Sequence, residues 1–232
     1  MSVSETMSPI PPPPATKKLD GSHGPLVWID CEMTGLNIEK GDRLLEIACI
    51  ITDGDLNPVD QGVSYVITTP KDVLDRMNAW CVNQHGISGL TEACLSPDHS
   101  YPHASVRAAI LAYVRDRIAQ PNAACLAGNT VHADKVFLVK EMPELVQHLH
   151  YRIVDVSTIK ELVKRWYGSE SDRVWQGQGK NMPNNNKNDD DANLVSKMDD
   201  QGDKKGDHRA LNDIRASIAE LKFYRQHVFQ KP

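Results

Sequence analysis

The sequence has no long hydrophobic run and no excess of positive charge. No apolar segment approaches the roughly 18 residues that a membrane-spanning helix needs, so we expect no membrane span. The 232 residues include 26 Lys and Arg against 31 Asp and Glu, a formal net charge of -5. A protein that coats nucleic acid without specificity is strongly basic, so this balance excludes that class. A short nucleic acid held at a metal site remains compatible, because metal ions supply the positive charge.

Cysteine is scarce, and its spacing forms no metal or redox motif. The five cysteines are scattered and include no CxxC pair. An odd, dispersed set in a sequence that can form a core indicates reduced thiols and an intracellular protein. With 40% hydrophobic and 25% charged residues, the composition is that of a globular protein. The length suits one domain with tails.

Two segments have too few apolar residues to support a core. Residues 1–24 contain a Pro-Ile-Pro-Pro-Pro-Pro run, and we interpret them as a disordered N-terminal tail. A mitochondrial presequence is a weaker interpretation, because this segment has no Arg and contains Glu5 and Asp20. Residues 169–206 are rich in Asn, Asp and Lys, which predicts a low-complexity loop insertion. The rest of 25–229 is expected to form the folded domain.

Short apolar runs and helical patterns alternate through the folded region. Strands are predicted at residues 26–29, 44–52, 62–68, 123–127 and 151–154. Helices are predicted at residues 71–80, 105–119, 131–141, 157–166 and 208–228. The Asp53-Gly54 turn favours an antiparallel meander of the first three strands, and Ser157 is a candidate N-cap. This order predicts a single α/β domain with a mixed five-stranded sheet flanked by helices.

Two carboxylates, Asp30 and Glu32, directly follow the first apolar run. Side chains alternate along a strand, so residues two apart project from the same face. Neighbouring carboxylates repel each other unless a cation neutralises them. For an isolated Asp-x-Glu, a solvated strand end is the commoner explanation. Ligand sites in open sheets, however, lie beyond the carboxyl ends of the strands, which is where this pair falls.

Three further residues could complete a site with this pair. Asp134 lies at the start of a predicted helix, where the helix dipole alone would favour an acidic residue. His208 and Asp213 are five residues apart and would diverge by roughly 140° on one helix. We therefore place His208 at or before the helix start, although an exposed loop histidine is the plain alternative. Imidazole titrates near neutral pH, so its neutral form can act as a base.

Together these residues form a set that could cut a phosphodiester bond. Carboxylates from three distant segments can hold two divalent cations, and a histidine beside them can take a proton from the attacking water. Oxygen ligands favour Mg²⁺ or Mn²⁺ over Zn²⁺. The order DxE, NxxxxD before Phe, and HxxxxD in a terminal helix resembles the DEDDh 3′-to-5′ exonuclease superfamily, whose fold is similar to ribonuclease H.

The flanking residues look like those of oligoribonuclease. The matching motifs are VWIDCEMTGL (27–36), AGNT (127–130), HYRIVDVST (150–158) and HRALNDIR (208–215). The resemblance covers about residues 25–229 apart from 169–206. The tail and the insertion depart from the compact bacterial pattern and suggest a eukaryotic source such as a fungus.

The resemblance implies a homodimeric exoribonuclease. Its expected location is intracellular, in the mitochondrion, the cytoplasm or both. Its substrates would be short single-stranded RNAs, above all dinucleotides, which it would cleave to 5′-mononucleotides with two Mg²⁺ or Mn²⁺ ions. By position, the implied metal ligands are Asp30, Glu32, Asp134 and Asp213. His208 matches the general base.

Seven other positions match substrate-binding residues of that family. Leu36 matches a wedge between the two bases, and Trp80 and His85 match pocket residues. The residues that match a cap on the 5′-phosphate are Thr130, Arg152 and Ser157. Tyr151 matches a residue that reaches the substrate of the neighbouring protomer.

The residues alone leave alternatives open. Leu36 and Trp80 could be core residues, and Arg152 could pair with Asp155. An exonuclease for longer substrates, or a binding module that retains the fold without catalysis, would also fit parts of the pattern.

Overall fold

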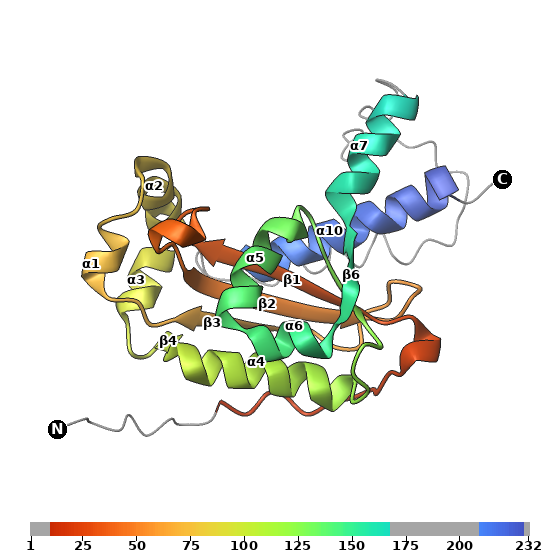
Figure 1. The fold of residues 1–232 in the computed structure, drawn as a ribbon, viewed down its shortest axis with the longest axis horizontal. Coiled ribbons are helices and arrows are strands. Elements are labelled where there is room, and N and C mark those ends of the chain that lie inside the picture. The colour runs from red at the N-terminus through yellow and green to blue at the C-terminus, as the bar shows by residue number, and fades with distance from the viewer. Residues whose placement is uncertain (1–9, 168–208, 230–232) are drawn as a thin grey trace, which may run out of the picture.

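The computed structural model describes residues 10–167 and 209–229, and a mixed six-stranded sheet in the order β4-β3-β2-β1-β5-β6 forms its centre (Figure 1). The strands are β1 (Leu26–Met33), β2 (Leu44–Thr52), β3 (Val63–Ile67), β4 (Ser100–Tyr101), β5 (Cys125–Gly128) and β6 (His150–Asp155). The α-helices are α1 (Lys71–Leu74), α2 (Ala79–Ile87), α3 (Leu90–Leu95), α4 (His103–Arg117), α5 (Val131–Glu141), α6 (Pro143–His148), α7 (Val156–Tyr167) and α10 (Arg209–Tyr224). Short 3₁₀ segments are η1 (Gly21–His23) and η2 (Ile38–Lys40), and α10 continues into a π-helical turn, η4 (Arg225–Phe229).

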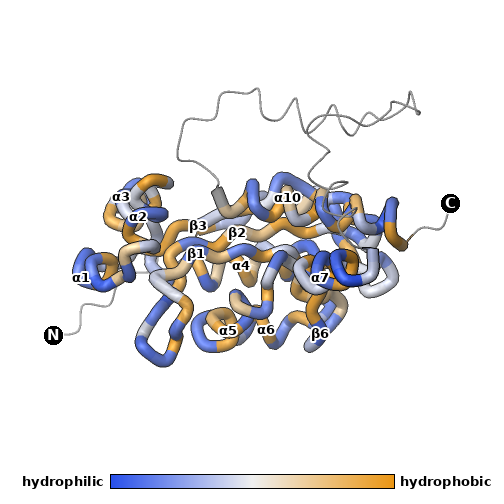
Figure 2. The backbone as a smooth tube through the Cα atoms, turned by 90° about the horizontal axis from the view of Figure 1, so that it is seen from above, coloured by the Kyte–Doolittle hydropathy of each residue, from blue (hydrophilic) through white to orange (hydrophobic). Residues whose placement is uncertain are grey.

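Strand β1 lies in the middle of the sheet, antiparallel to β2 and parallel to β5. Its side chains alternate between two cores. Val27 and Ile29 pack into the cluster that α4, α5 and α6 cover. Trp28 packs into the cluster of α10 and α7 on the other face. Figure 2 shows α10 on one side of the sheet and α5 and α6 on the other.

Several predicted elements are confirmed. The bounds of β2 (Leu44–Thr52) and α5 (Val131–Glu141) coincide with the predicted ones, and the first three strands form an antiparallel meander. The prediction of five strands is wrong, because β4 adds a sixth beside β3. Only two residues long, β4 is too short to leave a pattern in the sequence.

Two local predictions are also wrong. The helix predicted at 71–80 is instead α1 and α2, because the Asn78 side chain accepts a hydrogen bond from the Cys81 amide and starts a new helix. Ser157 is not the N-cap of α7, which begins at Val156. The carboxylate of Asp155 accepts the Ser157 amide hydrogen bond instead.

The segment predicted as a disordered tail is packed from residue 10 onward. Leu19 is buried in the core, and its amide donates to the Arg117 carbonyl at 2.7 Å. The Arg117 guanidinium also donates to the Pro13 carbonyl, and the Thr16 hydroxyl donates to the Val59 carbonyl. One buried leucine and a few hydrogen bonds connect this proline-rich segment, the N-terminal strap, to the domain, and such contacts leave no periodic pattern in the sequence.

Other predictions lie outside the described residues. These include the insertion at 169–206 and the position of His208. Within the part of the chain that the structure describes, no helix is both long and apolar enough to cross a membrane.

Candidate metal centre

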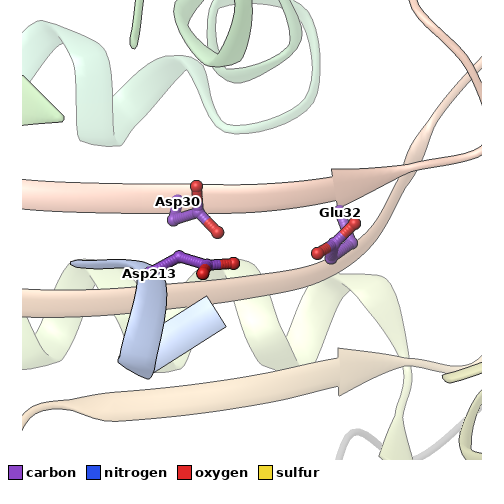
Figure 3. A group of neighbouring side chains, drawn as sticks. All are labelled: Asp30, Glu32 and Asp213. Carbon is purple, nitrogen blue, oxygen red and sulfur yellow. The ribbon is translucent and has the colours of Figure 1, made fainter. Parts of the chain in front are cut away.

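Three predicted carboxylates, Asp30, Glu32 and Asp213, converge on one face of the sheet (Figure 3). Each offers an oxygen atom, and these oxygen atoms all lie within 4.8 Å of one another. Asp30 and Glu32 lie within β1, not beyond its end, and project from the same face as Trp28. Helix α10 supplies Asp213, because Leu211, Ile214 and Ile218 anchor that helix against the same face.

Electrostatic repulsion is built into this cluster. Burial raises the pKa of Asp30 from 3.8 to about 8, with further contributions from the negative charges of Asp134, Asp213, Glu32 and Glu46. Protons therefore occupy the cluster at pH values where most carboxylates are ionised. A divalent cation would replace these protons and relieve the same repulsion. The all-oxygen donor set also fits a hard cation such as Mg²⁺ or Mn²⁺.

Asp134 lies beside the group of three but is fixed differently. It is in the first turn of α5, and its Oδ1 accepts the backbone amide hydrogen bond of Cys31 at 3.0 Å. Burial raises the pKa of Asp134 to about 7, although the amides of Asp134 and Cys31 partly oppose the increase. Its charge is the second-largest cause of the raised pKa of Asp30. The structure thus brings three of the four predicted ligands together, with the fourth attached to the β1 backbone next to them.

Glu46 is a further acidic residue of this region that the sequence analysis did not single out. The β1–β2 register places it directly opposite Glu32. It is buried, it accepts a hydrogen bond from the Ser64 hydroxyl at 2.7 Å, and it adds to the raised pKa of Asp30. Its sequence signal is one acidic residue within the fully buried, largely apolar strand Leu44–Thr52.

His85 closes one side of the cluster. It lies on α2, buried, with Nε2 2.9 Å from the Met33 carbonyl oxygen and Nδ1 3.8 Å from Glu32 Oε2. Nδ1 has no hydrogen-bond partner among the described residues. If the Nε2 hydrogen goes to Met33, the lone pair of Nδ1 remains available to a ligand.

Two apolar residues near this region are unusually exposed. Leu36, in the loop after β1, is 78% exposed, and Trp80, on α2, is 67% exposed. The alternative that they are core residues is therefore wrong. Large exposed apolar side chains beside polar groups are typical of binding sites.

Two of the three residues predicted to bind the terminal phosphate, Thr130 and Ser157, lie where β5 and β6 end. The register pairs Gly128 with Asp155, so the loop after β5 passes beside the start of α7. Gly128 is needed there, because a Cβ atom would come within 2.8 Å of the Ile29 carbonyl oxygen. The carboxylate of Asp155 accepts hydrogen bonds from the amide of Thr130 and from the amide and hydroxyl of Ser157.

Tyr151 and Arg152 lie together on β6, the edge strand. Tyr151 is 71% exposed, and the Arg152 guanidinium carbon lies 4.9 Å from the centre of its ring. The hydrogen-bond partners of the Asp155 carboxylate are Thr130, Ser157 and His132, so the alternative pairing with Arg152 is not observed.

His208, the predicted general base, lies outside the described residues. Helix α10 begins at Arg209, one residue later. The assignment of His208 stays a prediction.

Comparison with known proteins points in one direction. A family model described as Exonuclease matches residues 27–221. The chain is 43% identical to a probable oligoribonuclease of Schizosaccharomyces pombe, and the match covers 95% of this chain and 75% of that protein. It is 42% identical to the mitochondrial oligoribonuclease of Homo sapiens, over 89% of this chain and 74% of that one.

A solved structure supports the predicted fold. The zinc-bound complex of E. coli ExoI with single-stranded DNA superposes with a TM-score of 0.59 at 18% identity, covering 90% of this chain and 42% of that one. At this identity the likeness concerns the fold alone, which confirms the exonuclease-type architecture expected from the motifs.

Proposed function

Because the chain belongs to the oligoribonuclease family of exonucleases, we propose that it degrades short single-stranded RNAs, dinucleotides above all, from the 3′ end to 5′-mononucleotides. The observation that supports this most directly is the cluster of Asp30, Glu32 and Asp213, whose oxygen atoms lie within 4.8 Å of one another. Three carboxylates so close together on a partly buried face need protons or cations to neutralise them.

We propose that this cluster holds two divalent cations, Mg²⁺ or Mn²⁺, with Asp134 as the fourth acidic residue. When bound, such cations would stabilise negative charge on the phosphate and on the departing 3′-oxygen and would acidify the attacking water. His208 would take the proton of that water as general base. A general base of this kind contributes roughly 10²–10⁴ to the rate.

The remaining residues bind and orient the dinucleotide in this proposal. Leu36 and Trp80 offer exposed apolar surface to the two bases, and His85 offers Nδ1 beside Glu32. Thr130, Arg152 and Ser157 take the 5′-phosphate, for which the planar guanidinium of Arg152 supplies paired donors. A cap at the 5′ end limits length, because a longer chain would have to pass through it.

The exposed Tyr151 on edge strand β6 supports a homodimer in which Tyr151 reaches the substrate of the partner subunit. Sedimentation velocity should show a dimer at micromolar concentration. Tyr151→Ala should lower turnover of the dinucleotide without changing the thermal midpoint of unfolding. A monomer with full activity would contradict this proposal.

The domain organisation and the compartment are also proposals. The exonuclease domain would span 25–229, with 169–206 as a tolerated loop insertion. The similarity to the mitochondrial oligoribonuclease of Homo sapiens supports the mitochondrion as the compartment of this protein, and the cytoplasm is the alternative. Fractionation of cells that express the full chain would distinguish the two.

A product ladder tests the activity. RNAs of two to seven nucleotides with a labelled 5′ end are incubated with Mn²⁺, with and without EDTA. We expect mononucleotides from the shortest RNAs first, and no product with EDTA. Asp213→Asn removes one charge from the cluster at nearly constant volume and should lower kcat by at least about 10³-fold.

The matched control is Asp116→Asn, on an exposed site of α4 behind the sheet, which should keep wild-type turnover. Near wild-type activity of Asp213→Asn would refute the assigned centre. A strong preference for a twenty-nucleotide RNA over the dinucleotide would instead favour an exonuclease for longer substrates.

A further inference from the structure

Thr130 has a backbone conformation that a threonine rarely adopts. Its φ is 60° and its ψ is 25°, in the left-handed region. The branched Cβ of threonine clashes with the backbone there, so the conformation persists only where neighbouring groups enforce it. In the part of the chain that the structure describes, Thr130 is the one β-branched residue with positive φ.

The carboxylate of Asp155 is bonded to the backbone of Thr130 in this conformation. Asp155 Oδ1 accepts the Thr130 amide hydrogen bond at 2.9 Å, across from the neighbouring strand end. Asp155 Oδ2 lies 3.1 Å from Nδ1 of His132, in the first turn of α5. The side chain of Asp155 is only 6% exposed, so these contacts fix it on both sides. Burial raises the pKa of Asp155, but the hydrogen bonds from Ser157, His132 and Thr130 lower it by more, so the group stays ionised.

The same carboxylate also controls the Ser157 hydroxyl. The hydroxyl donates to Asp155 Oδ1 at 2.6 Å, and the Ser157 amide donates to the same oxygen at 3.0 Å. A serine has one hydroxyl hydrogen. In this arrangement Ser157 therefore presents lone pairs outward, and it must rotate its hydroxyl away from Asp155 before it can donate to a phosphate.

Helix capping alone does not explain these contacts. A capping aspartate accepts amide hydrogen bonds from the first turn of its own helix, as Asp155 does from Ser157. The bond to Thr130 belongs to a different loop, 25 residues earlier in the chain. That bond joins the two segments that carry the proposed phosphate donors.

We propose that Asp155 is the positioning residue of the terminal-phosphate site, a proposal that rests on the proposed function. Asp155 holds Thr130 in the left-handed conformation. It also accepts the hydrogen bond of the Ser157 hydroxyl until the hydroxyl rotates and donates to the 5′-phosphate of the RNA instead. Asp155 itself does not touch the phosphate. Its remaining hydrogen bonds, from two backbone amides and His132, satisfy the carboxylate after Ser157 has turned.

The test compares two dinucleotides that differ only in the 5′ group, one phosphorylated and one with a free hydroxyl. The measured quantity is the ratio of their kcat/KM values with Mn²⁺, called the phosphate preference. Asp155→Asn should lower the phosphate preference about 10- to 100-fold, the loss expected when donors to a charged group are misplaced. The loss should appear as a higher KM for the phosphorylated substrate. The kcat of that substrate, and the kcat/KM of the substrate with a free hydroxyl, should change less than about threefold.

The matched control is Asp53→Asn. Asp53 accepts amide hydrogen bonds from Asp55 and Asn57 in a turn where Leu56 also has positive φ, at the end of the sheet where β1 begins. This variant should keep the wild-type phosphate preference. If Asp155 had a purely structural role, Asp155→Asn would lower kcat/KM equally for both substrates and leave the phosphate preference unchanged. That outcome would overturn the inference.

Two safeguards keep the result interpretable. If Asp155→Asn does not fold, the comparison moves to the Thr130→Gly background, where glycine adopts the left-handed conformation unaided. Because glycine bypasses the role of Asp155 at Thr130, equal phosphate preferences of Thr130→Gly with and without Asp155→Asn would overturn the proposed control of the Ser157 hydroxyl. If the wild type itself shows no phosphate preference, the terminal-phosphate site of the proposed function fails and this inference fails with it.

Discussion

The ionisation state of Asp30 depends on whether protons or a divalent cation neutralise the acidic cluster. Its raised pKa of about 8 and that of Asp134, about 7, both lie above the ordinary 3.8. The folded protein without metal therefore holds protons that the unfolded chain releases. The stability that these protons confer is fully present below about pH 4 and is lost as the pH rises through 7 and 8.

This linkage predicts how metal changes stability with pH. Without metal, these two groups should make the thermal midpoint fall between pH 6 and pH 8.5. Mn²⁺ competes with protons for the same oxygens, so the gain in midpoint on adding it should be larger at pH 8.5, by about 5 °C. Differential scanning calorimetry in EDTA and in Mn²⁺ measures both.

Asp30→Asn is the control, because it removes the carboxyl group with the more strongly raised pKa of the two. In this variant the increase in thermal midpoint on adding Mn²⁺ should be small at both pH values. An equal gain at pH 6 and pH 8.5 in the wild type would contradict the assignment of this cluster as the metal site.

Most of the longer elements could be predicted from the sequence, whereas three of the shortest, α3, α6 and β4, could not. Strand β2 is an apolar run interrupted only by Glu46 before Thr52, and α5 follows a Gly-Asn-Thr turn, so both have clear limits. Helices α3 and α6 have six residues each, and β4 has two, which is too little for a period to emerge.

The grouping of Asp30, Glu32 and Asp213 was predictable for a different reason. Each carboxylate alone has a plain explanation, and it was the order of the DxE, NxxxxD and HxxxxD motifs along the chain that indicated a shared site. The packing of the tail and the hydrogen bond from the Thr130 amide to Asp155 were not predictable, because both depend on contacts between segments far apart in the sequence.

The loop after β1 gives a prediction at this scale. Leu36 is 78% exposed, so Leu36→Ala removes little buried surface and should leave the thermal midpoint within about 1 °C. If its side chain contacts the bases, KM for the dinucleotide should rise about tenfold. Steady-state kinetics with Mn²⁺ and thermal unfolding are the measurements.

The control for this prediction is Ile87→Ala, since Ile87 is 76% exposed at the end of α2 and has no proposed role. It should change neither quantity. A KM for Leu36→Ala equal to that of the control would remove Leu36 from the substrate site.

Across the whole molecule, a buried ion pair joins segments that are distant in sequence. Arg117 at the end of α4 is fully buried, and its Nε lies 2.5 Å from Oδ2 of Asp60, in the loop between β2 and β3. Tyr113 donates to the other oxygen of Asp60, and Arg117 reaches the Pro13 carbonyl of the N-terminal strap. The pair thus ties the strap and the helix to the sheet.

Removing one partner of the Asp60–Arg117 pair should therefore strongly lower the free energy of unfolding. Asp60→Asn leaves the Arg117 charge buried without compensation, and we expect a loss of about 3–5 kcal/mol in the free energy of unfolding. Urea denaturation measures it. Asp75→Asn breaks an exposed ion pair with Lys71 and should cost less than about 1 kcal/mol. Equal losses in the two variants would show that the buried pair is not a main structural tie.

The cluster on β1 also depends on the order in which the chain is made. Asp30 and Glu32 belong to the first strand, whereas Asp213 belongs to a helix that follows every strand of the sheet. A nascent or proteolysed polypeptide that lacks docked α10 would keep only two of the three clustered oxygens. Such a fragment would lack one of the proposed metal ligands, so the topology makes the assembly of the cluster depend on the docking of the last described helix.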